Sequence, residues 1–88
     1  MLKPSFTKQF ERDLKRTLKR GYNKEKIKAV IKKLVNEDAL EPQYHDHKLL
    51  GNYKNRRECH IEPDWILIYK IEGDRIIFER TGTHTDLF

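Results

Sequence analysis

Cysteine is nearly absent from this chain of 88 residues, and this scarcity excludes several classes of protein. A lone Cys59 cannot form an internal disulfide framework or a cysteine-rich metal site, and it fits a reducing compartment. The sequence also lacks an apolar run near the roughly 18 residues of a membrane span, a signal-peptide apolar core and a Gly-rich phosphate-binding loop. We therefore expect one cytoplasmic domain, residues 1–88, with a small core and no membrane association.

Acidic residues are scarce in the first part of the chain. Residues 1–36 contain 12 of the 19 Lys and Arg but only 3 of the 14 Asp and Glu, a net charge of +9 that leaves −4 for residues 37–88. Such a basic segment suits a polyanion such as RNA, although basic residues also simply keep surface helices in solution. Both interpretations apply to four residues of the first predicted helix: Lys15, Arg16, Lys19 and Arg20.

Two amphipathic helices are expected in this basic part. The first follows an N-cap at Thr7, has an apolar residue at every fourth position from Phe6, and ends at Gly21. The second follows an N-cap at Asn23, and its apolar residues recur at i, i+3, i+4, i+7 and i+8 from Ile27. Because each helix has one apolar stripe, we expect an antiparallel pair laid on a sheet.

The remaining sequence predicts that sheet, which makes the fold class α+β. Residues 2–5 form a candidate edge strand because Pro4 cannot serve a central one. An ordered loop is expected over residues 36–50, followed by a turn at Gly51-Asn52 and strands over 56–61, 65–71 and 75–80. The register of the last two strands stays open, since two-residue and three-residue loops place Arg80 beside different partners.

Strand alternation separates inward from outward side chains in the first of these strands. Arg57, Cys59 and Ile61 share one face, and His60 lies on the other. An inward Cys59 is a poor nucleophile, whereas His60 is expected to meet solvent or a ligand. His84 shares a side with Arg80 if the last strand continues that far, and Gly82 between them allows a close approach.

These residue types are suited to acid–base chemistry on a phosphate. Imidazole exchanges protons near neutral pH, and guanidinium can hold a phosphate by two hydrogen bonds. Each residue also has a structural interpretation: His60 at the surface, Arg80 paired with Glu79 or Asp64, and Trp65 in the core. Their joint occurrence in one small sheet favours metal-free RNA cleavage.

A metal site is a weaker alternative for the segment His45-Asp46-His47. Two histidines at i and i+2 can point the same way on a strand, but zinc usually takes three or four protein ligands. Cys59 and His60 are adjacent and would have to fold back to complete such a site. We therefore expect no metal and no other cofactor.

Four segments together resemble a known family, the YafQ branch of RelE-type toxins. They are residues 46–51 (DHKLLG), 59–70 (CHIEPDWILIYK), 78–84 (FERTGTH) and 87–88 (LF). The resemblance implies a toxin of a bacterial or archaeal type II toxin–antitoxin pair that cuts mRNA in the ribosomal A site without a metal. It also implies two N-terminal helices packed on a small, mainly antiparallel sheet.

The resemblance further implies roles for individual residues. The catalytic positions correspond to His47, His60, Asp64, Arg80 and His84. His84 is expected to be the general acid and Arg80 the clamp on the transition state, while His47 or His60, helped by Asp64, is the base. The implied RNA-binding residues are Trp65 and Phe88, to which we add Lys54, Arg57 and the four basic residues of the first helix. A terminal carboxylate on Phe88 would lie near the scissile phosphate.

The implied partners are mRNA, the ribosomal RNA of the A site and a small acidic antitoxin, with a monomeric toxin when free. Three other functions remain open at this point. They are a ribonuclease that needs no ribosome, a gyrase-targeting toxin of the related ParE type, and a non-catalytic RNA- or ribosome-binding module. The histidines at 47, 60 and 84 argue against the gyrase-targeting alternative, which needs no catalytic imidazole.

Overall fold

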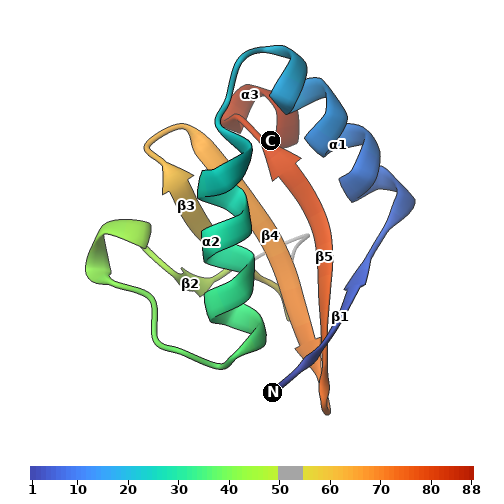
Figure 1. The fold of residues 1–88 in the computed structure, drawn as a ribbon, viewed down its shortest axis with the longest axis vertical. Helices are drawn as coiled ribbons and strands as arrows, with labels where there is room; N and C mark the ends of the chain where they lie inside the picture. Colours follow the sequence, from blue (N-terminus) through green and yellow to red (C-terminus); the bar gives the residue numbers. More distant parts are fainter. Residues whose placement is uncertain (50–54) are drawn as a thin grey trace.

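A computed structural model describes residues 1–49 and 55–88, and it combines helices with one mixed sheet (Figure 1). The elements in chain order are β1 (Lys3–Phe6), α1 (Lys8–Lys19), α2 (Lys24–Val35), the 3-10 helix η1 (Pro42–Tyr44), β2 (His47–Lys48), β3 (Arg57–Glu62), β4 (Trp65–Glu72), β5 (Arg75–Gly82) and α3 (His84–Leu87). The strand order is β1-β5-β4-β3-β2, and only the β1–β5 pair is parallel. The α+β class and the mainly antiparallel sheet are therefore confirmed.

Both long helices begin at the predicted caps. The Thr7 hydroxyl accepts a hydrogen bond from the Phe10 amide at 2.9 Å, and the Asn23 side chain accepts one from the Glu25 amide at 2.9 Å. Gly21 follows α1 with a φ of +95°, a conformation that glycine adopts without strain. Local capping chemistry thus fixes the ends of both helices.

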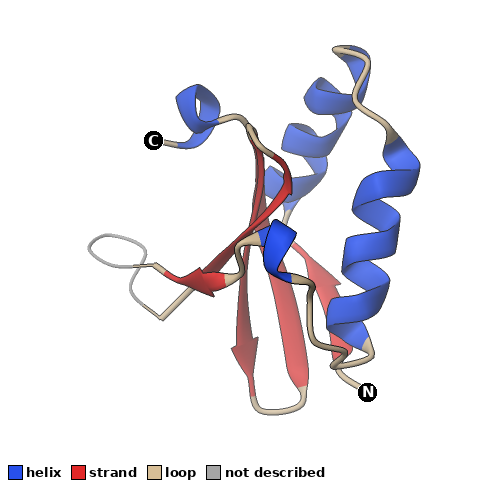
Figure 2. Ribbon diagram, turned by 90° about the vertical axis from the view of Figure 1, so that its left-hand side faces the viewer, coloured by secondary structure: helices blue, strands red, loops and turns tan. Residues whose placement is uncertain are grey.

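The two long helices cover one face of the sheet, and α3 lies on the other side (Figure 2). Between the helices and the sheet lies the main core, which includes Phe10, Val30, Trp65 and Phe78. A smaller cluster on the opposite face joins Ile66 and Ile68 of β4 to Leu87 of α3. We call the side that carries α3 the open face. Among the described residues, no helix has the length and apolar character needed to span a membrane.

A bulge in β5 decides which way Arg80 faces. Tyr69 pairs with Phe78, but the next residue back along β4, Ile68, pairs with Arg80, so Glu79 is an extra residue in the ladder. Phe78 and Tyr69 belong to the main core, whereas Ile68 belongs to the cluster on the open face. Because a shift of one residue reverses the side of a strand, the bulge places Arg80 on the open face.

Three predictions about local structure need correction or lie outside the described residues. The expected loop over residues 36–50 contains the short elements η1 and β2. The last strand, predicted over residues 75–80, extends to Gly82, and it stops short of His84 because Thr83 and Asp86 form a reciprocal capping box that starts α3. The turn expected at Gly51-Asn52 lies outside the described residues.

Candidate active site on the open face of the sheet

A row of polar side chains crosses the open face from strand to strand. His47 of β2 pairs with Glu58 of β3, Glu58 pairs with Ile68 of β4, and Ile68 pairs with Arg80 of β5. His60 follows two residues after Glu58 and therefore shares its face. The register thus brings together residues from four strands, and α3 begins beside them with His84.

All four histidines of the chain meet around His60. The centroid of its ring lies 5.6 Å from that of His45, 6.4 Å from that of His47 and 5.6 Å from that of His84. The last of these rings lies 6.3 Å from the ring of Phe88. The structure therefore brings the three predicted catalytic histidines into one cluster and adds His45 to it.

A buried carboxylate serves two of these rings. Glu58 Oε2 lies 3.0 Å from His60 Nε2 and 3.3 Å from His47 Nε2, and the Glu58 side chain is only 8% exposed. The other ring nitrogens also face acceptors, His60 Nδ1 the Pro63 carbonyl at 3.2 Å and His47 Nδ1 the His45 carbonyl at 2.6 Å. A carboxylate buried this deeply requires hydrogen-bond donors or cations beside it, and the two imidazoles provide them.

Sequence reasoning did not assign a role to Glu58. The sequence did contain a signal for it. Glu58 lies two residues before His60, so strand alternation places the carboxylate on the same face as the outward imidazole. The contact with His47, by contrast, depends on the pairing of β2 with β3.

His84 is oriented by Asp64 rather than by the strand it follows. Asp64 Oδ1 accepts a hydrogen bond from the His84 backbone amide at 3.0 Å and lies 2.7 Å from His84 Nδ1. These two hydrogen bonds, the backbone one first, lower the pKa of Asp64 below its ordinary value. Asp64 was expected to assist the base, but the structure places it with His84.

Arg80 is held by a buried carboxylate of α1. Asp13 accepts hydrogen bonds from Arg80 Nε at 2.6 Å and from the terminal nitrogen Nη2 at 3.2 Å. Asp13 is fully buried and also accepts from the Thr81 amide and from the side chains of Gln9 and Arg16. A bidentate pair of this kind fixes the plane of the guanidinium.

Neither partner suggested by the sequence holds Arg80. The Glu79 carboxylate pairs with Arg56, and Asp64 pairs with His84. The spacing within α1 was the available signal for Asp13. It lies three residues after Phe10 and four before Thr17, so it shares their face of the helix, and all three are buried.

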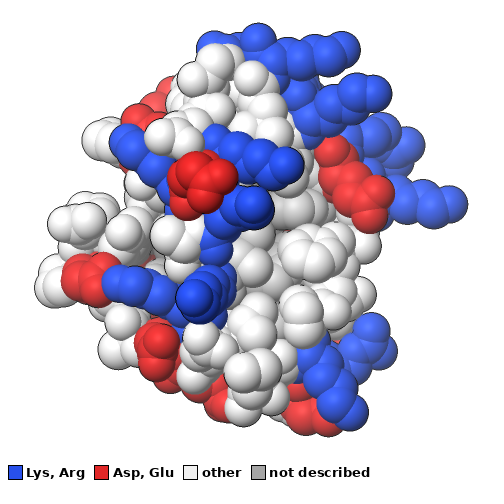
Figure 3. All heavy atoms as spheres, viewed as in Figure 1, with Lys and Arg blue, Asp and Glu red and all other residues white. Residues whose placement is uncertain are grey.

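The four basic residues predicted to bind RNA, three in α1 and the fourth at its C-cap Arg20, divide into two pairs. Arg20 lies 2.7 Å and Arg16 3.9 Å from the carboxylate of Asp86 in α3, and the hydrogen bond from Arg20 lowers the pKa of Asp86 to about 2. Lys15 and Lys19 are exposed and have no ion-pair partner among the described residues. Lys and Arg side chains gather over α1 on the surface (Figure 3). Arg16 and Arg20 therefore connect α1 to α3, which leaves the lysines accessible to a polyanion.

Burial changes the role predicted for Trp65. Its side chain is fully buried, its Nε1 donates to the Thr81 hydroxyl at 2.9 Å, and its ring packs against Tyr22. A ring enclosed by the core cannot stack on an RNA base, so Trp65 is corrected to a core residue. Phe88, in contrast, is 60% exposed beside His84 and is accessible for stacking.

One further predicted RNA-binding residue, Arg57, is not brought to the site. Arg57 lies on the face of the helices, where it donates to Asp46 at 3.2 Å. Lys54 lies outside the described residues.

The alternative chemistries suggested by the sequence find little support. Asp46 accepts hydrogen bonds from Arg57 and from the Tyr69 hydroxyl instead of joining His45 and His47. Over residues 1–49 and 55–88, no group of three or more potential ligands is arranged to hold a metal ion. Burial raises the pKa of the Cys59 thiol, which keeps it protonated and unreactive.

Comparisons with known proteins cover nearly the whole chain. Residues 2–88 match the model of a family described as "Bacterial toxin of type II toxin-antitoxin system, YafQ". The mRNA interferase toxin YafQ of Escherichia coli (strain K12) is 43% identical over 84 residues, which cover 94% of this chain and 91% of the relative.

Solved structures share the fold over the whole chain. The crystal structure of the Escherichia coli DinJ-YafQ complex superposes with a TM-score of 0.93 at 40% identity, covering 100% of this chain and 99% of that one. The crystal structure of a metal-bound toxin from Helicobacter pylori superposes with a TM-score of 0.94 at 38% identity, covering 100% of both chains. With the family matched along nearly its full length, this chain belongs to the YafQ family of toxins of bacterial type II toxin–antitoxin systems.

Proposed function

We propose that this protein is an mRNA endoribonuclease that acts by attack of a ribose 2′-OH on the adjacent phosphate. The observation that carries this proposal is the pair Arg80 and His84, each oriented by its own carboxylate, beside two imidazoles that share Glu58. The name of the Escherichia coli relative, an mRNA interferase toxin, agrees with it. The products are a 2′,3′-cyclic phosphate and a 5′-OH.

The first requirement is a base for the 2′-OH proton. Both nitrogens of His47 and of His60 face oxygen acceptors, so the imidazole that takes the proton must first release one of these contacts to the 2′-OH. The buried Glu58 carboxylate then stabilises the imidazolium that forms. The ring of His47 is half exposed, whereas that of His60 is largely covered. Either imidazole can act with Glu58, and single substitutions assign the proton acceptor.

The second requirement is positive charge on the pentacoordinate transition state. Asp13 binds the Nε and Nη2 nitrogens of Arg80 and so holds the guanidinium in one plane on the open face. Two arginines, Arg16 and Arg80, share the one Asp13 carboxylate, which leaves a net positive charge around it for a phosphate. Preorganised charge of this kind needs no rearrangement during the reaction.

The third requirement is an acid for the leaving 5′-oxygen. The contact with Asp64 occupies Nδ1 of His84, so Nε2 is the nitrogen that can donate a proton to substrate. Because hydrogen bonds from His84 lower the pKa of Asp64, the carboxylate stays negative and continues to hold Nδ1 of the ring. His84 is the general acid in this mechanism.

The basic surface of α1 supports cleavage on the ribosome rather than on free RNA. Lys15 and Lys19 lie exposed on a helix that also contacts the site through Asp13, so ribosomal RNA bound there would place the message on the open face. The DinJ-YafQ complex of Escherichia coli likewise supports a small antitoxin as the partner of this chain, and an acidic segment fits the positive charge of residues 1–36.

The test is to incubate the protein with ribosomes carrying a defined message and to analyse the RNA ends. Cleavage should yield a 2′,3′-cyclic phosphate, persist in EDTA while the ribosomes stay intact, and disappear when the nucleotide before the cleaved bond carries a 2′-deoxyribose. The same message without ribosomes measures the ribosome's contribution. Cleavage of the 2′-deoxy message would exclude the mechanism, and equal rates with and without ribosomes would favour a ribosome-independent nuclease.

A further inference from the structure

A groove that the mechanism does not use runs along the end of β3. Two overlapping hollows of about 330 and 310 Å³ share the residues Lys26, Gln43, Tyr44 and Ile61. These volumes are at the lower end of the roughly 300–1,000 Å³ usual for ligand sites. The second hollow is also lined by His60, so the groove is continuous with the candidate active site.

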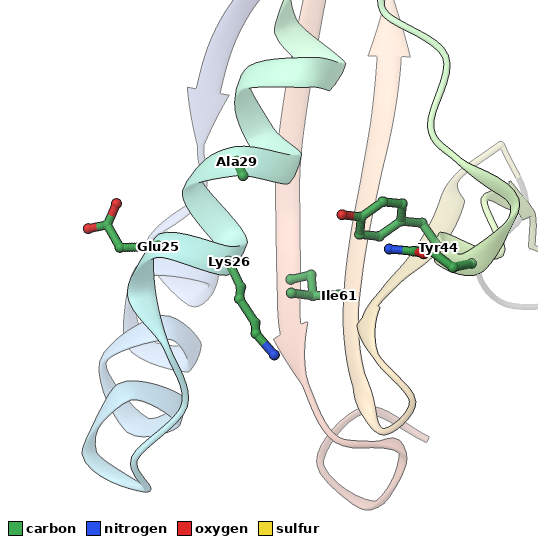
Figure 4. A pocket seen from close by; sticks show the side chains of 6 residues that line it. Glu25, Lys26, Ala29, Tyr44 and Ile61 are labelled. Atoms are coloured by element: carbon green, nitrogen blue, oxygen red, sulfur yellow. The ribbon is translucent and has the colours of Figure 1, made fainter.

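The walls of the groove come from three elements. Lys26 and Ala29 of α2 lie on one side of Ile61, and Tyr44 of η1 lies on the other (Figure 4). Ile61 is 8% exposed and provides an apolar floor. Tyr44 is half-buried against the main core, and Lys33 Nζ lies 5.9 Å from its ring centroid. The groove therefore offers an aromatic ring that is anchored by packing.

The charges around the groove favour a neutral occupant. Lys26 lies 3.7 Å from Glu62, Lys33 is paired with Glu41, and Glu25 lies 4.0 Å from Lys28. Each cation near the groove thus has a carboxylate beside it, and no surplus of positive charge remains to attract a phosphate. A flat, neutral ring that carries hydrogen-bonding edges fits these walls better than an anion.

We propose that this groove binds the base of an mRNA nucleotide next to the scissile phosphate. The inference rests on the proposed function, because it needs an RNA strand on the open face. In it, Tyr44 stacks on the base, and the exposed amide of Gln43 donates to and accepts from its edge. The sugar and phosphate of the nucleotide remain on the side of His60.

A base bound here makes cleavage depend on the sequence of the message. Stacking on Tyr44 adds affinity for any base, whereas the Gln43 amide discriminates among base edges. Tyr44 and Gln43 are therefore specificity-determining residues of the proposed reaction and take no part in proton transfer.

The experiment uses ribosome-bound messages that differ in one base on either side of the cleaved bond. Tyr44→Leu keeps the bulk of the side chain without its aromatic face, and Tyr44→Phe keeps the ring. Gln43→Ala removes the amide from an exposed position. Lys26→Gln and Lys28→Gln form a matched pair, since both lysines are exposed, lie on α2 and are paired with a glutamate, but only Lys26 lines the groove.

The expected loss for Tyr44→Leu is about tenfold in cleavage rate at subsaturating message, with rates converging at saturation. Tyr44→Phe should keep most of the rate that Tyr44→Leu loses, and Gln43→Ala should flatten the preference among bases. Lys26→Gln should cleave more slowly because it leaves Glu62 unpaired at the groove, whereas Lys28→Gln should cleave like wild type. Equal rates for the Leu and Phe variants at the same melting temperature, with an unchanged base preference in Gln43→Ala, would overturn the groove inference alone. A wild-type protein that cleaves none of the messages would overturn the proposed function and this inference together.

Discussion

The two faces of the sheet carry different kinds of side chain. The face beneath α1 and α2 is apolar, and its largest side chains, such as Trp65 and Phe78, are fully buried. Among the residues that the structure describes, the open face has a small apolar cluster under α3 and histidines held by Glu58 and Asp64. Burial of apolar area supplies most folding free energy, so stability depends mainly on the first face and chemistry on the second.

This difference teaches that the two faces should respond separately to substitution. Exposed ion pairs contribute little to stability, so the open face can lose a catalytic group without unfolding. The contacts of Asp13 and Glu58 are exceptions, because both carboxylates are buried and contact Arg80 and two imidazoles, respectively. Substitutions in each region therefore test whether the separation holds.

The largest effect expected is on activity, from His84→Ala on the open face. The variant should cleave about 10²–10⁴-fold more slowly, the usual contribution of a positioned acid or base. Its melting temperature should stay near that of wild type because the side chain is about half exposed. Single-turnover cleavage and thermal melting measure the two quantities, and full cleavage activity in this variant would exclude His84 as the general acid.

On the helix-covered face, Trp65→Ala should show the opposite pattern. Removing this fully buried ring should cost about 3–5 kcal/mol of unfolding free energy, as for other buried aromatic residues. Urea denaturation gives the free energy, and Trp65→Phe is the milder control that keeps most of the apolar volume. A Trp65→Ala protein that is as stable as wild type but cleaves poorly would return this residue to the RNA-binding set.

Phe88→Ala should reduce activity by roughly ten- to hundredfold at subsaturating ribosome, since stacking on an aromatic is worth about 1–3 kcal/mol per base. Its 60% exposure predicts an unchanged melting temperature. Normal melting together with normal cleavage would remove Phe88 from the site, whereas a lower melting temperature would assign it to packing.

Acidification tests the link between α1 and α3. Since the pKa of Asp86 is lowered to about 2 by Arg20 and the Thr83 amide, its carboxylate stabilises the fold above its ordinary pKa of about 4. That contribution is lost as the pH falls through about 2. Melting temperatures measured from pH 7 to pH 2 should therefore fall more steeply for wild type than for Asp86→Asn, and parallel curves would contradict the link.

The smallest effect expected concerns Lys15 and Lys19. Replacing both by Gln should weaken ribosome binding and lower its salt dependence by roughly one unit of slope per lost phosphate contact. Folding and intrinsic chemistry should not change, because both side chains are exposed. Replacing Arg16 and Arg20 is the contrasting pair, since it also disturbs the contacts with Asp13 and Asp86. Binding that is unaffected by the lysine changes would leave these residues as solubilising surface charge.

Local patterns predicted the parts of this fold that depend on neighbouring residues. The caps at Thr7 and Asn23 and the alternation of β3 follow from spacing within one element, so they could be read from the sequence. Asp13 could not be assigned to Arg80, because the two are 67 residues apart and meet only after α1 packs beside β5. For the same reason sequence reasoning found no role for Glu58 and assigned Asp64 to the base: tertiary packing chooses which carboxylate contacts each histidine.

Burial corrected what residue type alone suggested. Trp65 is aromatic and adjacent to Asp64, which made it a reasonable stacking residue in the sequence. It lies on the central strand β4, however, and the main core encloses its ring. Phe88 is also aromatic and lies at the end of the short helix α3, where it remains exposed. Their position in the fold, rather than their chemical type, decides which of the two rings is accessible to an RNA base.

The bulge at Glu79 lets Phe78 and Arg80, two residues apart, face opposite sides of the sheet. Deleting Glu79 would let the β4–β5 ladder close regularly with Phe78 still opposite Tyr69 and Arg80 still opposite Ile68. Deleting Ile77 instead would place Phe78 opposite Lys70 and turn Glu79 toward the apolar core beside Tyr69. The loss of one codon in this hairpin is therefore nearly silent or harmful to folding, depending on which residue it removes.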